Sequence, residues 1–295
     1  MKLTYYWILA PLLLLLLVVY YIMSCILSIE FPIDTHTQFT VRVNTFRRND
    51  LLEKFLAHYT TCDEIKEIQV IWSDQENTIP STLQKQYSSD KVKYEQHDTD
   101  KLSNRFRSLL NIPTEGVLSI DDDLLISCRE LSQAHSVWTA NKRALVGFSP
   151  RMNAYDPNTG ADRYLRWQHT WWNGVYSIIL TKACFLHKNF LEQFFKVLPE
   201  ERIRKIDANR NCEDIAMAYV VARETNAPPV WVRGVVNEEA SEGISTGVSH
   251  FIDRSDCLRD LREIDSKRVW IPSYQKAESI SSVFDLFKLF SGRYM

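Results

Sequence analysis

Residues from about 39 to 141 alternate between short β-branched, apolar segments and segments with apolar residues at helical spacing. This alternation is typical of β-α-β units, in which parallel strands form one sheet and helices cover both of its faces. We expect strands at residues 39–44, 65–72, 92–95 and 117–120, and helices at residues 50–59, 79–87, 104–110 and 127–141. The pattern predicts an α/β fold with a mainly parallel sheet.

The second half of the chain is less regular. Asp156–Gly160 carries the residue types of a tight turn. Asn211 is expected to cap a helix that begins at Cys212. The remaining expected elements are strands at residues 144–148, 175–181 and 230–236, and helices at residues 182–196 and 212–224.

Three aspartates, Asp121, Asp122 and Asp123, directly follow the apolar strand expected at residues 117–120. In open α/β sheets, ligands bind beyond the carboxyl ends of the strands. Strand alternation would place Asp121 and Asp123 on one side and turn Asp122 away. Because Mg²⁺ and Mn²⁺ share phosphate oxygens with one or two carboxylates, the triad predicts a cation-bound diphosphate. A solvated acidic turn is the alternative.

A second acidic pair, Glu213 and Asp214, stands at the start of the helix expected after Asn211. The helix dipole alone favours negative charge there. A catalytic carboxylate beside a sugar is the other interpretation, because glycosyl transfer with retention stabilises an oxocarbenium-like centre.

Three arginines, Arg48, Arg105 and Arg254, have the right chemistry to contact a diphosphate, although each alone could be an ordinary surface residue. The aromatic residues between 164 and 172 would either stack on a sugar ring or fill a core. Neither of the glycine-rich phosphate-loop motifs occurs. A net charge of -2 without a long basic run argues against a nucleic-acid partner.

Residues 243–247 match the G-x-S-x-G motif of hydrolases. That motif requires a buried strand before the serine, and the polar residues 237–242 do not form one. The downstream histidine, His250, also follows without an acidic residue in between. A flexible loop is therefore favoured over a hydrolase nucleophile.

Residues 5–29 contain no charged side chain, and at 1.5 Å per residue a helix of this length exceeds the ~30 Å hydrocarbon core. No Ala-x-Ala site follows, so an uncleaved anchor is favoured over a cleaved signal peptide. Lys2 precedes the segment and Glu30 follows it, which predicts a cytoplasmic tail at residues 1–4 and a lumenal remainder. The remainder divides into a stem at residues 30–37, a catalytic domain at residues 38–270 and a tail at residues 271–295.

Four motifs resemble the exostosin-type glycosyltransferases of family 64: FRRNDLL at 46–52, SIDDD at 119–123, VGFSPR at 146–151 and NCEDIAM at 211–217. The resemblance covers about residues 38 to 265. It implies a GT-A fold, a single-pass type II protein of the Golgi membrane, Mn²⁺ dependence, and transfer of a sugar from a nucleotide donor with retention. A homodimer is left open.

The resemblance also implies residue roles. Asp123 resembles the Mn²⁺ ligand and Asp214 the catalytic carboxylate. Other positions resemble donor-binding residues: Arg48, Ser73, Asp100, Arg105, Asp121, Asp122, Glu213, His250 and Arg254.

A disulfide between Cys212 and Cys257 is likewise implied by the resemblance, and it would leave Cys62, Cys128 and Cys184 unpaired. With Cys25 inside the expected anchor, the remaining cysteines are odd in number, so at least one thiol must stay free.

Several positions depart from the animal members that use N-acetylhexosamine donors. Those members carry Asn where this chain has Ser73 and Asp100, and Asp where it has Glu213. The motifs WWNGVYS at 171–177 and NAPPVWV at 226–232 are instead similar to plant members that transfer mannose to glycosyl inositol phosphorylceramides. We therefore expect GDP-mannose as donor and a membrane sphingolipid as acceptor. A UDP-N-acetylhexosamine transferase acting on a glycan and a non-catalytic sugar-binding membrane protein are the alternatives.

Overall fold

The computed structural model describes residues 37–87, 90–239, 248–265 and 269–278, together with Leu14 and Val18; for residues 248–252 it describes the backbone alone. Apart from those two positions, the expected tail, anchor and stem before residue 37 lie outside the described residues. The G-x-S-x-G segment and most of the C-terminal tail lie outside them as well. Among the helices that are described, none has the length and apolar character needed to cross a membrane.

Eight of the described strands form the main sheet, in the order β13-β11-β6-β10-β4-β1-β2-β3, and the others form a three-stranded sheet, β8-β7-β9, and a two-stranded sheet, β12-β5. In the main sheet, β10 runs antiparallel to its two neighbours, and the other paired strands are parallel. The predicted fold class, a mixed and mostly parallel sheet, is confirmed. The strands of the main sheet are β1 Phe39–Thr45, β2 Ile65–Trp72, β3 Val92–Gln96, β4 Gly116–Asp121, β6 Val146–Gly147, β10 Ala183–His187, β11 Val230–Arg233 and β13 Lys276–Glu278.

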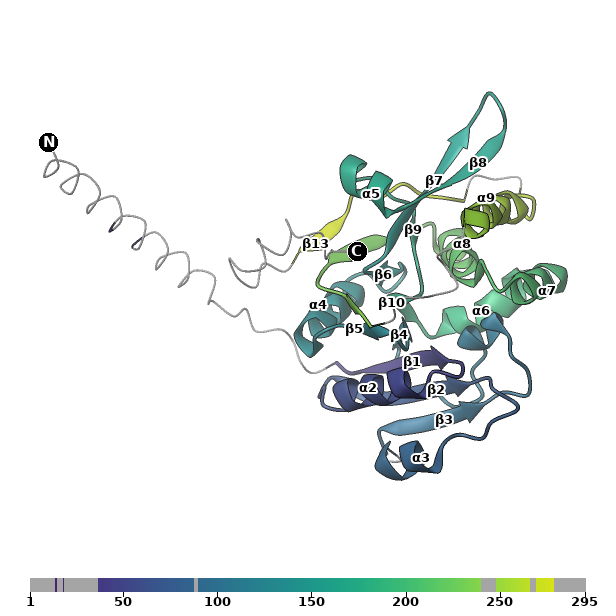
Figure 1. The fold of residues 1–295 in the computed structure, drawn as a ribbon. Helices are drawn as coiled ribbons and strands as arrows, with labels where there is room; N and C mark the ends of the chain where they lie inside the picture. The colour runs from purple at the N-terminus through teal and green to yellow at the C-terminus, as the bar shows by residue number, and fades with distance from the viewer. Residues whose placement is uncertain are drawn as a thin grey trace, which may run out of the picture.

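Helices cover both faces of this sheet (Figure 1). The strands separate two apolar cores: Leu118 and Ile120 of β4 face one, and Val117 faces the other. This follows from the two-residue period of a strand that is buried on both sides. The first core is covered by α2 Asn49–Tyr59, α3 Ser81–Tyr87 and α4 Cys128–Thr139, and the second by α6 Asn189–Val197, α8 Glu213–Thr225 and α9 Val248–Arg262.

The single helix predicted at residues 182–196 is wrong. Ala183–His187 forms β10, and α6 begins only at Asn189. Within β10, Phe185 faces the first core and Leu186 the second. A short apolar run buried on both sides cannot be distinguished from a buried helix by periodicity alone, which explains the error.

A β-hairpin projects from the domain at the turn predicted at Asp156–Gly160 (Figure 1). Gly160 adopts φ 68°, which glycine tolerates without strain. The hairpin strands β7 Pro150–Asp156 and β8 Ala161–Leu165 pair with each other, and β7 also pairs with β9 Ile178–Ile179, where a longer strand was expected. The remaining elements are a 3₁₀-helix at Leu102–Phe106, β5 Leu124–Leu125, α5 Trp167–Asn173, α7 Glu200–Asn209 and β12 Asn237–Glu238.

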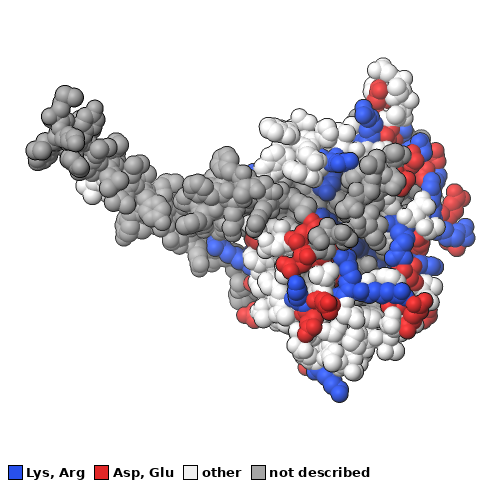
Figure 2. Space-filling model, in the orientation of Figure 1, with Lys and Arg blue, Asp and Glu red and all other residues white. Residues whose placement is uncertain are grey.

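Charged side chains of both signs are intermingled on the face shown in Figure 2. The pairing between α7 and α9 illustrates this arrangement. Arg202 lies 3.3 Å from Asp260 and 2.8 Å from Glu263, and Lys205 also pairs with Asp260. These partly exposed ion pairs help to set the position of α9 against the rest of the domain.

Capping residues were used to predict the starts of two helices, and the structure confirms one of these two N-caps. Ser127 is the N-cap of α4 and accepts a hydrogen bond from the Glu130 N–H at 3.2 Å, as the capping box predicts. Asn211 is not the cap of α8. The N-cap is Cys212, which has φ 87° and makes no capping hydrogen bond through its side chain. Its sulfur instead forms a disulfide bond with Cys257.

Two disulfides are present among the described residues. The bond between Cys212 and Cys257 joins the start of α8 to α9, with the Cα atoms 6.2 Å apart. The expectation that Cys62 and Cys128 are unpaired is wrong, because they form a second disulfide with a Cα distance of 5.3 Å. It joins the turn after α2 to the start of α4. Cys184 is free and buried, as the odd number of cysteines requires.

Replacing both Cys62 and Cys128 with Ala should lower the free energy of unfolding by about 4 kcal/mol, because the bond closes a long loop in the unfolded chain. Urea unfolding of the full chain measures this difference. Adding dithiothreitol should make the two proteins converge, since reduction removes the same bond from the wild type. Equal stability under oxidising conditions would contradict the prediction.

Candidate active site

The parallel strands β1, β2, β3 and β4 end at one edge of the sheet, and the candidate residues follow those ends. Asp121 is the last residue of β4 and lies opposite Asn44 of β1. Arg48 lies three residues after the end of β1 and is the N-cap residue of α2. The sheet topology therefore brings Arg48 and the aspartate triad together although they are far apart in the sequence.

Arg48 contacts two of the three aspartates. Its Nη1 donates to Asp123 Oδ2 at 2.8 Å, and its Nη2 lies 3.0 Å from Asp122 Oδ1. The predicted alternation stays a prediction: Asp122 shares Arg48 with Asp123, but its carboxylate is fully buried, whereas the side chains of Asp121 and Asp123 are partly exposed. Strand geometry ends at Asp121, so the next two residues share one guanidinium partner.

The triad concentrates negative charge in a poorly solvated place. Burial raises the pKa of Asp122 to about 7, although Arg48 opposes the shift. Burial also raises the pKa of Asp123, and the nearby charges of Asp121 and Glu238 add to this effect. A divalent cation would relieve such like-charge repulsion.

The carboxylates of the triad fit a metal ion that takes most of its ligands from substrate phosphates and water. Among the residues with described side chains, no group of three or more His, Cys, Asp or Glu could enclose a metal ion by itself. Mg²⁺ is commonly held by one or two carboxylates together with substrate phosphates and water. Asp123, which retains some exposure beside its Arg48 partner, fits the role of a single protein ligand.

Arg105 connects the triad to the second acidic pair. It comes from the 3₁₀-helix Leu102–Phe106, is buried, and donates to Asp121 Oδ1 and, at 3.3 Å, to Thr181 Oγ1. Burial would lower its pKa, but the charges of Asp121 and Glu213 outweigh this effect and raise it. Arg105 therefore carries a permanent positive charge between the two acidic groups.

At the start of α8, Asp214 is buried and held from two sides. Its Oδ1 accepts the Ile215 N–H at 2.7 Å, and its Oδ2 accepts from Arg254 Nη2 at 3.0 Å. Arg254 comes from α9, and its Nη1 donates to the Tyr164 hydroxyl at 2.9 Å. The Cys212–Cys257 disulfide joins the same two helices. Asp214 is thus kept in a fixed orientation.

Glu213, next to Asp214, has an unusual protonation equilibrium. Burial and the Asp214 charge raise its pKa to about 7 despite the nearby guanidinium groups of Arg105 and Arg254. Two adjacent carboxyl groups in different environments are a common arrangement in sugar chemistry, because one can hold a proton near neutral pH.

A buried ionic network behind the site was missed at the sequence level. Arg42 of β1 donates to both carboxylate oxygens of Glu95, at 3.0 and 3.1 Å, and to the carbonyl oxygens of Arg105 and Arg107, at 3.4 and 3.0 Å. Burial opposes ionisation of Glu95, but hydrogen bonds from His97 and Arg42 lower its pKa to about 2. The network anchors the segment that carries Arg105. An arginine inside an apolar strand was its visible sign in the sequence.

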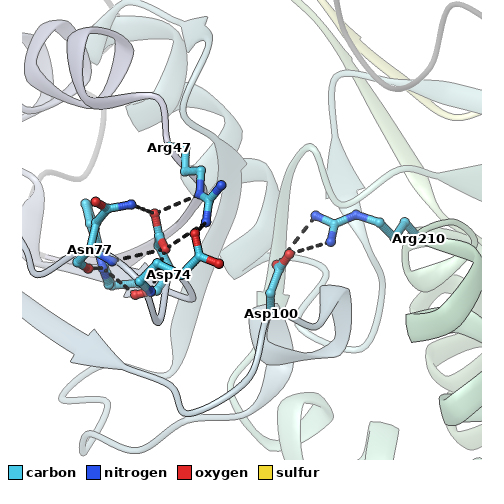
Figure 3. A network of polar contacts seen from close by, with 7 residues as sticks. Arg47, Asp74, Asn77, Asp100 and Arg210 are labelled. Atoms are coloured by element: carbon cyan, nitrogen blue, oxygen red, sulfur yellow. Dashed lines mark hydrogen bonds and ion pairs between the residues drawn. The ribbon is translucent and has the colours of Figure 1, made fainter.

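Ser73 and Asp100, two further predicted donor-binding residues, follow the ends of β2 and β3. Ser73 Oγ accepts from Asn104 Nδ2 at 3.0 Å. Asp100 forms an ion pair with Arg210, which follows α7 (Figure 3). His250 lies in the first turn of α9, but its side chain is outside the described residues.

The aromatic residues between 164 and 172 differ in burial: one packs against the domain and another is exposed. Trp171 packs against Trp231, with ring centroids 6.1 Å apart, and the Arg233 guanidinium lies 4.5 Å above the Trp171 ring. The core interpretation therefore holds for Trp171. Trp172 is 84% exposed, so its ring is free to contact a sugar or a surface.

Residues 39–281 match the model of the Glycosyl transferase family 64 domain. The chain belongs to glycosyltransferase family 64. It is 33% identical over 261 residues to glycosylinositol phosphorylceramide mannosyl transferase 1 of Arabidopsis thaliana, covering 79% of this chain and 78% of that protein.

Two further relatives extend this comparison. Mouse exostosin-like 2 is 30% identical over 239 residues, which cover 77% of this chain and 72% of that protein. Glucosamine inositolphosphorylceramide transferase 1 of Oryza sativa is 29% identical over 238 residues, which cover 78% of this chain but only 31% of that protein. The predicted resemblance to family 64, with both plant and exostosin relatives, is confirmed.

The raised pKa of Glu213 predicts how the stability of the folded protein changes with pH. Because the folded protein retains this proton to a higher pH than the unfolded chain does, ionisation of Glu213 costs stability as pH rises from about 4.5 through 7. Glu213→Gln should therefore match the wild type at pH 4.5 and be more stable at pH 8. Urea unfolding at several pH values measures this, with the exposed Glu224→Gln as control. A variant that is less stable at pH 8 would contradict the prediction.

Proposed function

We propose that this family 64 enzyme is a Mn²⁺-dependent, retaining transferase that moves mannose from GDP-mannose onto a glycosyl inositol phosphorylceramide. The observation that supports it best is Arg105, a buried cation that donates to Asp121 of the triad and interacts electrostatically with Glu213 and Asp214. This arrangement provides one side for a diphosphate and another for the sugar attached to it. The mannosyl transferase relative supports the choice of sugar and acceptor.

In this proposal the diphosphate lies at the triad. Asp123 would hold Mn²⁺, which when bound would neutralise charge on the departing diphosphate. Arg48 exchanges one of its present carboxylate partners for phosphate oxygens, to which its planar guanidinium is well suited. Asp121 and Asp122 contact the remainder of the donor, and Arg254 and His250 approach the diphosphate from α9.

The sugar would lie beside Glu213 and Asp214. As the bond between the anomeric carbon and the phosphate oxygen breaks, positive charge develops on the sugar ring. Asp214, held in place by Arg254 and the Ile215 N–H, stabilises or attacks that centre. The acceptor hydroxyl then forms the new bond on the same face, and its proton passes to the departing diphosphate. Two routes are compatible with this arrangement: Asp214 forms a covalent intermediate with the sugar, or the acceptor attacks directly on the same face. Both routes use the same residues.

The proposed acceptor and the proposed subcellular location are based on the relatives and on the N-terminal sequence. Two of the plant relatives carry inositol phosphorylceramide in their names. An anchor at residues 5–29 with a stem of a few residues would keep the domain near the membrane, where such a lipid resides. We therefore propose a single-pass type II protein of the Golgi membrane. A homodimer stays a prediction.

A transferase of N-acetylhexosamine from a UDP donor is the second candidate, favoured by the exostosin-like relative and by the glucosamine transferase relative. The third candidate, a silent sugar-binding protein, is disfavoured by the retained acidic groups on both sides of Arg105.

Donor hydrolysis by the full chain with Mn²⁺ and a panel of nucleotide sugars separates these three candidates. We expect turnover of GDP-mannose and a loss of turnover when Mn²⁺ is chelated. Use of UDP-N-acetylglucosamine in its place would transfer the assignment to the second candidate. If no donor is bound or turned over, the assignment of the protein as an enzyme is refuted.

Two substitutions separate the proposed roles within the site. Asp123→Asn should lose the Mn²⁺-dependent part of nucleoside diphosphate binding. Asp214→Asn should keep that binding and lower the turnover rate by at least about a hundredfold, because it removes the charge beside the anomeric carbon. Calorimetric titration and steady-state kinetics measure the two effects. Asp50→Asn, at an exposed position in α2, is the matched control. Unchanged behaviour of either variant would refute its assigned role.

A further inference from the structure

The β7–β8 hairpin lies against α9, and Arg262 at the end of that helix contacts it in three places (Figure 1). The Arg262 Nη2 atom lies 2.8 Å from Asp162 Oδ2 of β8 and donates to the Gly160 carbonyl oxygen at 2.7 Å. Its guanidinium carbon lies 4.5 Å from the centroid of the Tyr155 ring of β7. One side chain of α9 therefore contacts both hairpin strands and the turn between them.

The ion pair between Arg262 and Asp162 is not an ordinary surface pair. Only 2% of the Asp162 side chain is exposed, against 30% of the Arg262 side chain. Exposed ion pairs contribute little to stability, whereas a buried carboxylate that loses its cation is left with an uncompensated charge. Without Arg262, Asp162 would regain water only if the hairpin moved away from α9. The position of the hairpin on α9 therefore depends on this pair.

Tyr164 lies on the same face of β8 as Asp162, because alternate residues of a strand point to one side. Its backbone N–H donates to Ser255 Oγ of α9 at 3.1 Å, and its hydroxyl accepts from Arg254 Nη1 at 2.9 Å. Arg254 and Arg262 belong to the same helix. The hairpin therefore meets α9 at two places, one at Arg262 and one at Arg254.

Arg254 transmits the position of the hairpin to the second acidic pair. It is buried, and its guanidinium donates through Nη1 to Tyr164 and through Nη2 to Asp214 Oδ2 at 3.0 Å. Both nitrogens belong to one rigid, planar group, so a displacement of Tyr164 changes the orientation of the bond to Asp214. A continuous series of contacts therefore runs from Arg262, through the hairpin and Arg254, to Asp214.

We infer that Arg262, through its ion pair with Asp162, positions Asp214 for the transfer step by holding the hairpin against α9. The inference rests on the proposed function, in which Asp214 acts at the anomeric carbon. Arg262 is a positioning residue, because it acts on Asp214 through the hairpin and Arg254.

Loss of the Arg262 contact should affect turnover more than donor binding. In the proposed function the metal side of the donor is held by Asp123 and Arg48, which follow β4 and β1 and belong to neither the hairpin nor α9. The hairpin instead acts on the orientation of Asp214. A small displacement of a reacting group slows a reaction strongly even where the substrate still binds.

Steady-state kinetics of donor turnover by the full chain, with Mn²⁺ and whichever nucleotide sugar the wild type uses, tests the inference. Arg262→Met removes the ion pair and should lower kcat about tenfold, while the KM for the donor stays close to the wild-type value. Arg262→Lys keeps a positive charge beside Asp162 and should recover most of the lost kcat. Arg259→Met is the matched control and should leave kcat unchanged, because Arg259 pairs within α9, with Asp256 at 2.8 Å.

Asp162→Asn provides the second arm. It removes the same ion pair from the other side, so a variant with both changes should lose no more activity than Arg262→Met alone. Hydrogen exchange of the Tyr164 amide should be faster in Arg262→Met, because the bond of this amide to Ser255 requires the hairpin to lie on α9. Losses that multiply in the double variant, or an unchanged exchange rate, would overturn the inference.

Failure of the inference can be distinguished from failure of the proposed function. If the wild type turns over no donor, the proposed function fails, and the role of Arg262 in turnover fails with it. If the wild type turns over a donor while Arg262→Met keeps its kcat, or changes only the KM, the inference fails alone. An equal loss of kcat in Arg259→Met would also overturn it.

Discussion

The buried guanidinium of Arg105 is the interaction on which the rest of the site depends. It donates to Asp121 at the end of β4 and interacts electrostatically with the Glu213–Asp214 pair at the start of α8. Without a cation there, two groups of carboxylates would face one another in a poorly solvated interior, at a cost of several kcal/mol. In the proposed function, the same cation would join the two sides of a sugar diphosphate site.

Contacts with other parts of the chain hold Arg105 and the second acidic pair in place. Arg42 binds the backbone of its segment, and the Glu95 carboxylate neutralises Arg42. On the other side, the Cys212–Cys257 disulfide and the bond from Arg254 to Asp214 hold α8 to α9. The polar groups of the site are thus oriented before a donor arrives, which lowers the reorganisation needed during reaction.

The sequence predicted the parts of this arrangement that depend on local pattern. The strand and helix periods of the first half located β1 to β4 and hence the edge where Arg48 and Asp121 meet. The Arg42 network and the Cys62–Cys128 bond depend on contacts between distant segments, for which a single sequence carries no periodic signal. The misassigned helix at residues 182–196 shows the same limit, because Phe185 and Leu186 pack on opposite faces of a sheet whose neighbours are remote in sequence.

The anomeric configuration of the product tests the central claim most directly. In the proposed function, Asp214 lies beside the anomeric carbon, and the new bond forms on the face from which the diphosphate departs. Incubating the full chain with GDP-α-mannose, Mn²⁺ and a glycosyl inositol phosphorylceramide, followed by NMR of the lipid product, should show a newly added α-mannosyl residue. A β-linked mannose would contradict retention and the role of Asp214, and an unmodified lipid would contradict the proposed transfer.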